Sequence, residues 1–250
     1  MSYISYQHVD RAFGSQVVCK DLTLDIEKGE SFCIIGPSGT GKTVTIKMLI
    51  GLILPDAGEI IFDGISLSSL KRDEDYLPIR KRIAMVFQGA ALFDSMTVFD
   101  NVAYGLRKLK LPPNELKDKV EEKLVWVGLQ NSIDKMPSEL SGGMKKRIGL
   151  ARAIATDPEV VLYDEPTAGL DPINTVRIVD LIVSLQDKLK STAIMVTHDI
   201  PSVQRMSTRV AFLYQGQVRA LGTIQEMMNH QDPFVRGFLN SDPSLTDILS

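Results

Sequence analysis

The segment GPSGTGKT, residues 36–43, has the residue types and the spacing of a phosphate-binding loop, G-x-x-x-x-G-K-[ST]. It follows an apolar run typical of a strand and precedes a helical pattern, as this motif requires. Its glycines allow backbone N–H groups to surround phosphates, Lys42 would reach the β- and γ-phosphates, and the Thr43 hydroxyl would hold Mg²⁺. The alternative is an ordinary glycine-rich turn, which the context on both sides disfavours. We therefore predict that a nucleotide contacts Gly36, Pro37, Ser38, Gly39, Thr40, Gly41, Lys42, Thr43 and Val44.

Two carboxylates end a second apolar run, VVLYDE, at residues 160–165. A strand here would place Asp164 next to the phosphate loop, where it would hold Mg²⁺ through a water molecule. Glu165 follows directly and would polarise the attacking water. The alternative is an ordinary acidic strand end, which the presence of the loop at Lys42 in the same chain disfavours.

Gln88 and His198 also directly follow apolar runs, RIAMVFQ and TAIMVTH. In open parallel sheets, ligands bind at the carboxyl ends of the strands. Gln88 would contact Mg²⁺ or the attacking water, and His198 would hydrogen-bond the γ-phosphate. A lone histidine is more often structural, so this prediction depends on four strand ends that all carry groups suited to phosphate or metal.

A second helix start suited to an anion lies in ELSGGMKKR, residues 139–147. Paired glycines follow Ser141 and precede a helical pattern, so unbonded N–H groups and the positive end of the helix dipole come together. The chain thus has two predicted phosphate sites, although one nucleotide needs only one loop.

Strands alternate with helices along most of the chain, which predicts an α/β fold with a mostly parallel sheet covered on both faces. Two N-terminal segments are typical of an antiparallel β addition, and the strand pattern disappears between Phe99 and Ala155, which predicts a helical insertion. The expected core strands are Ser31–Gly36, Arg82–Gln88, Val160–Glu165, Thr192–His198 and Arg209–Gly216, and the expected N-terminal strands are Tyr3–Val9 and Val17–Ile26. We predict a core of residues 1–98 and 156–222, a helical subdomain of residues 99–155 and an interaction tail of residues 223–250.

Composition limits the class of protein. The 250 residues include 28 Lys and Arg against 31 Asp and Glu, a formal net charge of -3 that does not favour binding to nucleic acid. We interpret the basic clusters at residues 80–82 and 145–147 as solvated helix faces. Cys19 and Cys33 lie in apolar runs and are expected to be buried, reduced thiols. No apolar run reaches the roughly 20 residues that span a bilayer, and the N-terminus lacks the features of an export signal. We expect a soluble, cytosolic-type protein that reaches a membrane only through a partner.

The ordered set of motifs resembles the ATP-binding cassette family over nearly the whole chain. The matching segments are the phosphate loop at Gly36–Thr43, the Q-loop at Gln88, the signature at Leu140–Gly143, Walker B through Asp164 and Glu165, the D-loop at Gly169–Asp171 and the switch at His198. The resemblance implies a P-loop NTPase with a RecA-like core, an N-terminal antiparallel β subdomain and an α-helical insertion, and it implies hydrolysis of ATP with Mg²⁺. It also implies that Phe13 stacks on the adenine, whereas the residues alone predict a core aromatic.

In this family two copies pair head to tail, and each ATP lies between the phosphate loop of one copy and the signature helix of the other. Ser141, Gly142 and Gly143 would contact the γ-phosphate of the partner's ATP, and Asp171 would act across the interface. Two-fold symmetry then completes two composite sites. The resemblance thus explains why one chain carries two phosphate sites.

Secondary features resemble the cassettes of Mla/Mce-type phospholipid transporters. They are FQGAALFDSMTVFDNV from Phe87, Tyr163 in Walker B, THDIPSV from Thr197 and the tail HQDPFVRGFLNS from His230. The resemblance implies a membrane permease (MlaE-like), a periplasmic Mce-domain protein (MlaD-like) and, in many such systems, a small STAS-domain protein (MlaB-like). It places the chain at the cytoplasmic face of the inner membrane as a peripheral subunit. The signature departs from most cassettes in having Met144 where Gln is usual.

Two rival functions stay open. One is the ATPase of an importer for a small polar solute such as an amino acid. The other is a non-transport cassette protein acting on DNA or ribosomes. The lack of a long coiled-coil insertion, of a second cassette and of a basic surplus argues against the second rival.

Overall fold

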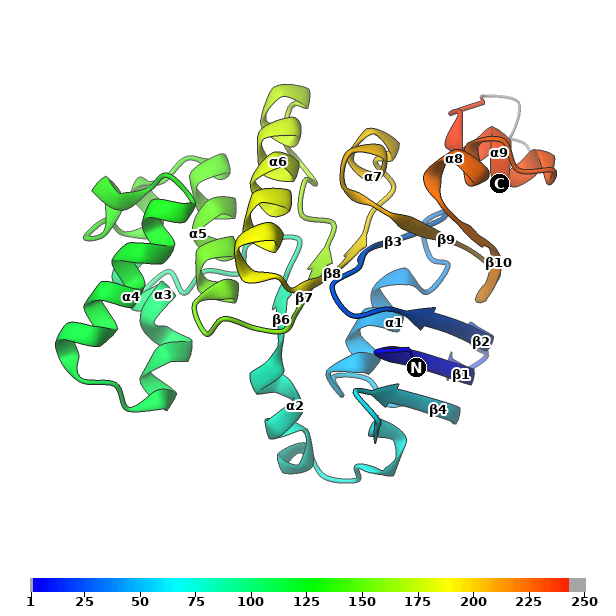
Figure 1. Cartoon of the computed structure of the whole chain (residues 1–250), viewed down its shortest axis with the longest axis horizontal. Coiled ribbons are helices and arrows are strands. Elements are labelled where there is room, and N and C mark those ends of the chain that lie inside the picture. The colour runs from blue at the N-terminus through cyan, green and yellow to red at the C-terminus, as the bar shows by residue number, and fades with distance from the viewer. Residues whose placement is uncertain (1, 243–250) are drawn as a thin grey trace. The chain divides into compact units, whose positions relative to one another are not determined.

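The computed structural model describes residues 2–242 of the chain, and its elements are shown in Figure 1. Residues 1–80 with residues 192–250 form one unit, which carries the phosphate loop and is called the loop unit below. Residues 81–191 form the other unit, which carries the signature residues and is called the signature unit. Helix α2, Leu77–Arg82, contains the division between them.

The loop unit contains two sets of paired strands. In the first set β1 pairs antiparallel with β2 and with β4, in the order β2-β1-β4-β5. In the second set β3 lies between β8 and β9 and runs parallel to both, and β10 pairs antiparallel with β9. The strands are β1 Ile4–Phe13, β2 Gln16–Ile26, β3 Ser31–Ile35, β4 Ala57–Phe62, β5 Ile65–Ser66, β8 Thr192–Val196, β9 Arg209–Tyr214 and β10 Gln217–Gly222.

Burial follows the sequence pattern of each strand. The four residues Phe32–Ile35 of β3 and all five of β8 are buried, as expected for apolar runs in a parallel sheet that is covered on both faces. In β2 the residues Leu22, Leu24 and Ile26 are buried and those between them are exposed, which is the alternation of a strand with one solvated face.

The helices of the loop unit include two near the C-terminus that pack on its own strands. Phe234 of α9 is 6% exposed, and its ring centroid lies 5.8 Å from that of Phe212 in β9. The described part of the predicted tail, residues 223–242, is therefore anchored within the loop unit, and residues 243–250 lie outside the described residues. The helices are α1 Lys42–Leu49, α7 Ile200–Met206, α8 Ile224–Met228 and α9 Pro233–Leu239, with short 3₁₀ turns η1 Leu67–Ser69 and η2 Asp73–Tyr76.

The signature unit joins two parallel strands to a group of helices. Val86 of β6 pairs with Tyr163 of β7 at one end of this ladder. Helix α3 begins after Thr97, whose side chain accepts a hydrogen bond from the N–H of Asp100, and Gly128 follows α4 with φ 69°, as expected for a C-terminal cap. The elements are β6 Ile83–Val86, α3 Val98–Leu106, η3 Arg107–Leu109, α4 Pro113–Trp126, η4 Gln130–Ser132, η5 Pro137–Glu139, α5 Gly142–Ile154, β7 Val160–Asp164 and α6 Pro172–Leu189.

The predicted α/β class, the five core strands, the two N-terminal strands and the helical insertion are confirmed. Strands β4, β5 and β10 were not predicted, because each is short or interrupted by glycine and charged residues. The predicted subdomain boundaries after residues 98 and 155 stay a prediction, since the division into units lies at residues 80 and 191.

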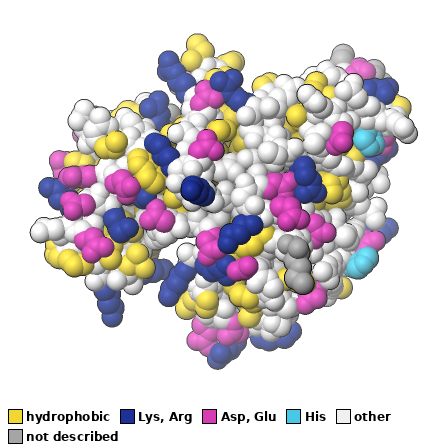
Figure 2. All heavy atoms as spheres, in the orientation of Figure 1, with side chains coloured by type: hydrophobic (Ala, Val, Ile, Leu, Met, Phe, Trp, Pro, Cys, Tyr) yellow, Lys and Arg dark blue, Asp and Glu magenta, His cyan; other side chains and the backbone are white. Residues whose placement is uncertain are grey.

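Cys19 and Cys33 are free and buried, as expected. Burial raises the pKa of the Cys19 thiol to about 11 and that of Cys33 to about 12, so both are protonated at neutral pH. Among residues 2–242, no helix combines the length and the apolar character needed to cross a bilayer. On the face shown in Figure 2, Lys and Arg side chains are interspersed with Asp and Glu.

Candidate nucleotide-binding site

The phosphate loop connects β3 to α1 in a backbone conformation that requires glycine. Gly36 has φ 145° and Gly41 has φ 96°, values that side chains other than glycine rarely adopt. A Cβ on Gly36 would lie 2.1 Å from the carbonyl oxygen of Leu213, and one on Gly41 would lie 2.5 Å from that of Val18. The backbones of β9, at Leu213, and of β2, at Val18, therefore lie so close to the loop that only glycine fits at these two positions.

Helix α1 begins without a side chain that caps its first turn. Its N-cap, Gly41, offers no side-chain acceptor, and no acidic residue lies in the first turn. By contrast, α3, α5, α6, α7, α8 and α9 each begin after a residue whose side chain accepts a backbone N–H. Helix α4 also lacks a side-chain cap. The uncapped, glycine-led start of α1 fits the predicted binding of phosphate at the positive end of the helix dipole, which stays a prediction.

Lys42 places its ammonium group at this loop. The side chain is 8% exposed, and Nζ donates to the carbonyl oxygens of Gly36 at 2.8 Å and Pro37 at 2.7 Å. The Thr40 hydroxyl donates to the same Pro37 oxygen at 2.9 Å, which closes the loop on itself. A cation held at a helix start fits a polyphosphate, and the contact of Lys42 with the β- and γ-phosphates stays a prediction.

A cavity of about 340 Å³ opens beside the loop within the same unit. It is lined by β2, by the loop and by the turn after β9, through Val17, Val18, Pro37–Thr40 and Tyr214–Gly216. A Cβ on Gly39 would meet nothing within 4 Å, so this part of the loop backbone is accessible from the outside.

Phe13 is exposed at the end of β1, where 45% of it is accessible. It is therefore not a core aromatic. The Arg11 guanidinium lies 4.5 Å from its ring centroid and is itself fixed by Asp56 at 2.7 Å. An exposed ring in a fixed position fits the predicted stacking on adenine.

His198 lies at the same strand edge as the loop. Ile34 of β3 pairs with Val196 of β8, and Gly36 and His198 each come two residues after that pair. The Thr197 N–H donates to the Ile34 carbonyl oxygen at 3.3 Å, so the ladder continues up to the histidine. The His198 side chain is exposed.

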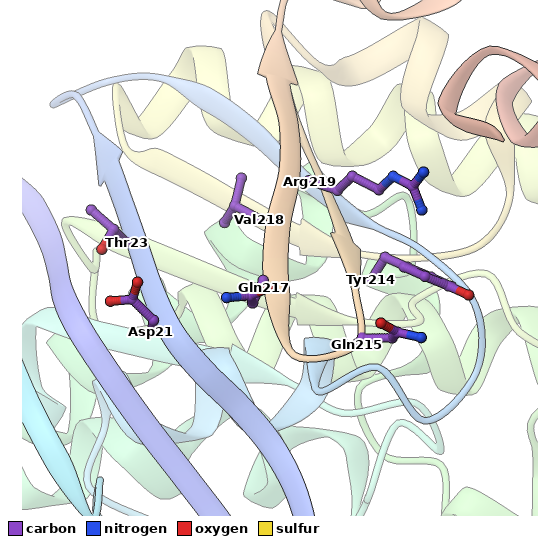
Figure 3. A pocket seen from close by; sticks show the side chains of 7 residues that line it. All are labelled: Asp21, Thr23, Tyr214, Gln215, Gln217, Val218 and Arg219. Carbon is purple, nitrogen blue, oxygen red and sulfur yellow. The ribbon is translucent and has the colours of Figure 1, made fainter. Parts of the chain in front are cut away.

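A second cavity, of about 430 Å³, lies between β2 and the β9–β10 hairpin. In Figure 3, Gln217 and Val218 lie between β10 and β2, whereas Tyr214, Gln215 and Arg219 lie on the other side of the hairpin. None of the residues predicted to bind nucleotide lines this cavity, so it is separate from the predicted nucleotide contacts.

In the signature unit, two predicted catalytic residues lie at one strand edge. Gln88 and Glu165 each come two residues after the paired Val86 and Tyr163. Asp164 ends β7 and is 7% exposed. Glu165 has φ 47°, a left-handed conformation that non-glycine residues adopt mainly where the surrounding structure enforces it. The strand thus ends in a sharp turn directly at the predicted base.

The signature residues form the first turn of α5. Ser141 is the N-cap, and its Oγ accepts the N–H of Met144 at 3.3 Å. Because a hydroxyl has one donor and two acceptor positions, this cap leaves the O–H free to donate. A Cβ on Gly142 or Gly143 would meet nothing within 4 Å, so the backbone here is open to an approaching ligand.

Asp171 caps α6 and uses both carboxylate oxygens in doing so. Asn174 donates to it from its backbone N–H at 3.0 Å and from its side-chain amide. These hydrogen bonds lower the pKa of Asp171 below its usual value, so the residue is ionised at neutral pH.

The interpretation of the basic clusters as solvated helix faces is wrong for three side chains. Arg80 donates to the carbonyl oxygens of Ile50 and Gly51. Arg82 forms a bidentate ion pair with Glu159. Lys146 donates to the carbonyl oxygen of Gln88. Sequence analysis missed Lys146 because a lysine on a polar helix face gives no local signal of its tertiary partner.

Comparisons with known proteins show which family the chain is similar to. A family model described as ABC transporter matches residues 19–168. The probable ribonucleotide transport ATP-binding protein mkl of Mycobacterium leprae is 40% identical over 238 residues, which cover 95% of this chain and 68% of that protein. The intermembrane phospholipid transport system ATP-binding protein MlaF of Escherichia coli (strain K12) is 42% identical over 228 residues, which cover 91% of this chain and 84% of that protein.

Two solved structures have the same fold. The cbiO1 protein from Clostridium perfringens, described as part of the ABC transporter complex cbiONQ, has a TM-score of 0.85 and 28% identity, with 99% of this chain and 98% of that chain covered. The ATP-binding cassette MJ0796, described as a dimer in a post-hydrolysis state bound to ADP and Pi, has a TM-score of 0.79 and 30% identity, with 88% and 98% covered.

Proposed function

This chain belongs to the ABC transporter family and is an ATP-binding transporter subunit, and from that premise we propose that it powers phospholipid transport through a separate membrane permease. The observation that carries the proposal is the extent of the similarity to MlaF, which covers 84% of that protein. The similarity to mkl, whose name refers to ribonucleotides, covers 68% of that protein. The segments starting at Phe87, Thr197 and His230 also resemble the phospholipid branch.

The chain's own groups suit ATP hydrolysis. In the proposed mechanism, backbone N–H groups of residues 39–43 and Lys42 bind the phosphates, and Phe13 stacks on the base. Glu165 accepts a proton from the attacking water, while Gln88 and His198 orient the water and the γ-phosphate. Thr43 and Gln88, with Asp164 through water, would hold Mg²⁺, which neutralises phosphate charge when bound.

Each nucleotide site is completed by a second copy of the chain. Ser141, Gly142 and Gly143 would donate to the partner's γ-phosphate, and Asp171 would approach the partner's site. The open backbone at both glycines and the free donor position of the Ser141 hydroxyl support this role. The description of MJ0796 as a dimer supports the pairing.

An exposed aromatic surface in the signature unit would receive the permease. Phe93 and Tyr104 are 38% and 43% exposed, and their ring centroids lie 4.6 Å apart. Both follow the Gln88 segment along the chain, so a partner bound here could sense changes at that segment. We propose an MlaE-like permease as this partner, with MlaD-like and MlaB-like proteins in the same complex at the cytoplasmic face of the inner membrane.

Purification of the tagged chain from detergent-solubilised membranes tests the cargo and the partners together. We expect a permease and bound phospholipid to copurify, and the complex to hydrolyse ATP. A solute-binding protein in place of an Mce-domain protein would support the importer rival and overturn the phospholipid proposal. Copurification of nucleic acid or ribosomes without a permease would overturn a transport role.

A further inference from the structure

One face of α5 holds the segment that carries Gln88. Lys146, Gly149 and Arg152 lie three residues apart and therefore share this face. Lys146 Nζ donates to the Gln88 carbonyl oxygen. Arg152 donates to the carbonyl oxygens of Ala90 at 3.0 Å and Ala91 at 2.7 Å.

The segment held in this way has an unusual backbone. Ala90 and Ala91 have φ values of 59° and 48°, which alanine adopts only where neighbouring groups enforce them. Gly149 allows the close approach, because a Cβ at this position would lie 3.2 Å from the Ala90 carbonyl oxygen. Helix α5 therefore fixes the path of the chain directly after Gln88.

Lys146 also interacts with the predicted base. It is partly buried, which lowers its pKa, and the Glu165 carboxylate acts in the opposite direction. One ammonium group thus lies close enough to Glu165 to interact with it electrostatically while it donates to the backbone of Gln88. Its position is three residues after Gly143, in the next turn of the same helix.

We propose that Lys146 is a positioning residue that links the signature helix to Gln88 and Glu165 of the same chain. The proposal rests on the proposed function, in which the N-terminus of α5 contacts the partner's ATP. A shift of this helix start on ATP contact moves Lys146 as part of a rigid helix, and with it the carbonyl of Gln88 and the charge beside Glu165. Through Lys146, occupation of the partner's site thereby accelerates hydrolysis at the chain's own site above the rate of a single occupied site.

The test compares Lys146→Met with Lys146→Arg in the complete complex with its permease. We expect Lys146→Met to lower kcat by about tenfold to hundredfold, because displaced catalytic groups cost that much, while KM for ATP changes little. Cooperativity in ATP should fall towards a Hill coefficient of about 1, since the sites become independent. Lys146→Arg keeps the charge and the hydrogen-bond donors, so it should keep most of the wild-type kcat and most of the cooperativity.

Lys145→Met is the matched control. Lys145 is the neighbouring residue on α5, and within residues 2–242 no hydrogen bond or ion pair of its side chain is found, so both parameters should stay at the wild-type values. If Lys146→Met does not fold, Lys146→Gln, which keeps a donor without the charge, takes its place and should lose part of kcat and part of the cooperativity.

Three outcomes would overturn the inference: an unchanged kcat in Lys146→Met or its substitute, a rise in KM that accounts for the whole loss, or an equal loss in Lys145→Met. A wild-type complex without ATPase activity would instead overturn the proposed function, so the two failures are distinguishable.

Discussion

Glu165 combines a catalytic residue type with a strained backbone. Its φ of 47° costs a non-glycine residue about 1–3 kcal/mol, and the residue directly follows the buried strand β7. The strain turns the chain sharply at the point where the carboxylate is needed. We regard it as part of the arrangement that positions the base.

Glu165→Gln tests the role of this residue. The amide keeps the shape of the side chain but cannot accept a proton, so we expect ATP binding to persist while turnover falls by about 10²–10⁴-fold. Single-turnover hydrolysis and nucleotide affinity, both measured on the complex, check this. Glu159→Gln is the control, because Glu159 lies just before the same strand and pairs with Arg82, away from the predicted chemistry. Normal turnover in Glu165→Gln would refute the assignment.

Residues at strand ends could be predicted from sequence, and residues that act through packing could not. Asp164, Gln88 and His198 each lie at the end of an apolar run, so the local pattern alone predicts that they lie at the edge of a sheet. Lys146 has the same local pattern as Lys145. Only the packing of α5 against the segment after Gln88 separates the two, and no local pattern encodes that contact.

At the scale of elements, the start of α5 serves both stability and function. Ser141 caps the helix through Met144, and the same hydroxyl is the proposed donor to the partner's nucleotide. A substitution can therefore disturb either role, and a pair of variants is needed to separate them.

Ser141→Ala and Ser141→Gly make that pair. Loss of an N-cap to alanine should lower the free energy of unfolding by about 1 kcal/mol, whereas glycine should cost only a few tenths. Both variants lack the hydroxyl, so both should lose ATPase activity to a similar extent. Denaturant unfolding and ATPase assays check this. If activity followed stability, with Ser141→Gly nearly normal, the hydroxyl would be only a cap.

The elements themselves were predictable in proportion to their length and apolar character. Strands β3, β7 and β8 are continuous apolar runs and were found. Strand β4, AGEIIF, begins with Ala, Gly and Glu, and β5 has only two residues. Strand β4 pairs with β1, which is distant in sequence, and β5 pairs with β4. The contact with β1 is the tertiary information that a local pattern lacks.

At the scale of the whole molecule, the predicted nucleotide groups are divided between the two units. The loop unit carries the phosphate loop, Phe13 and His198, and the signature unit carries Gln88, Asp164, Glu165 and the start of α5. We propose that the start of α5 contacts the nucleotide bound to a second copy of the chain. This claim came from the resemblance to a family, because nothing in the spacing of one chain states which copy a helix start faces.

Mixing two inactive variants tests this claim most directly. Lys42→Ala removes the loop's cation, and Ser141→Arg blocks the start of α5, so complexes of either variant alone should be inactive. A mixed pair contains one site with an intact loop and an intact partner helix, and we predict that ATPase activity returns in part on mixing, since the second site of the pair binds no ATP and cannot accelerate the first. Chains that carry both substitutions, mixed with wild type, are the control, because no mixed pair then contains an intact site. If the two single variants stay inactive when mixed although mass measurement shows mixed pairs, or if Ser141→Arg alone is fully active, the composite site is contradicted.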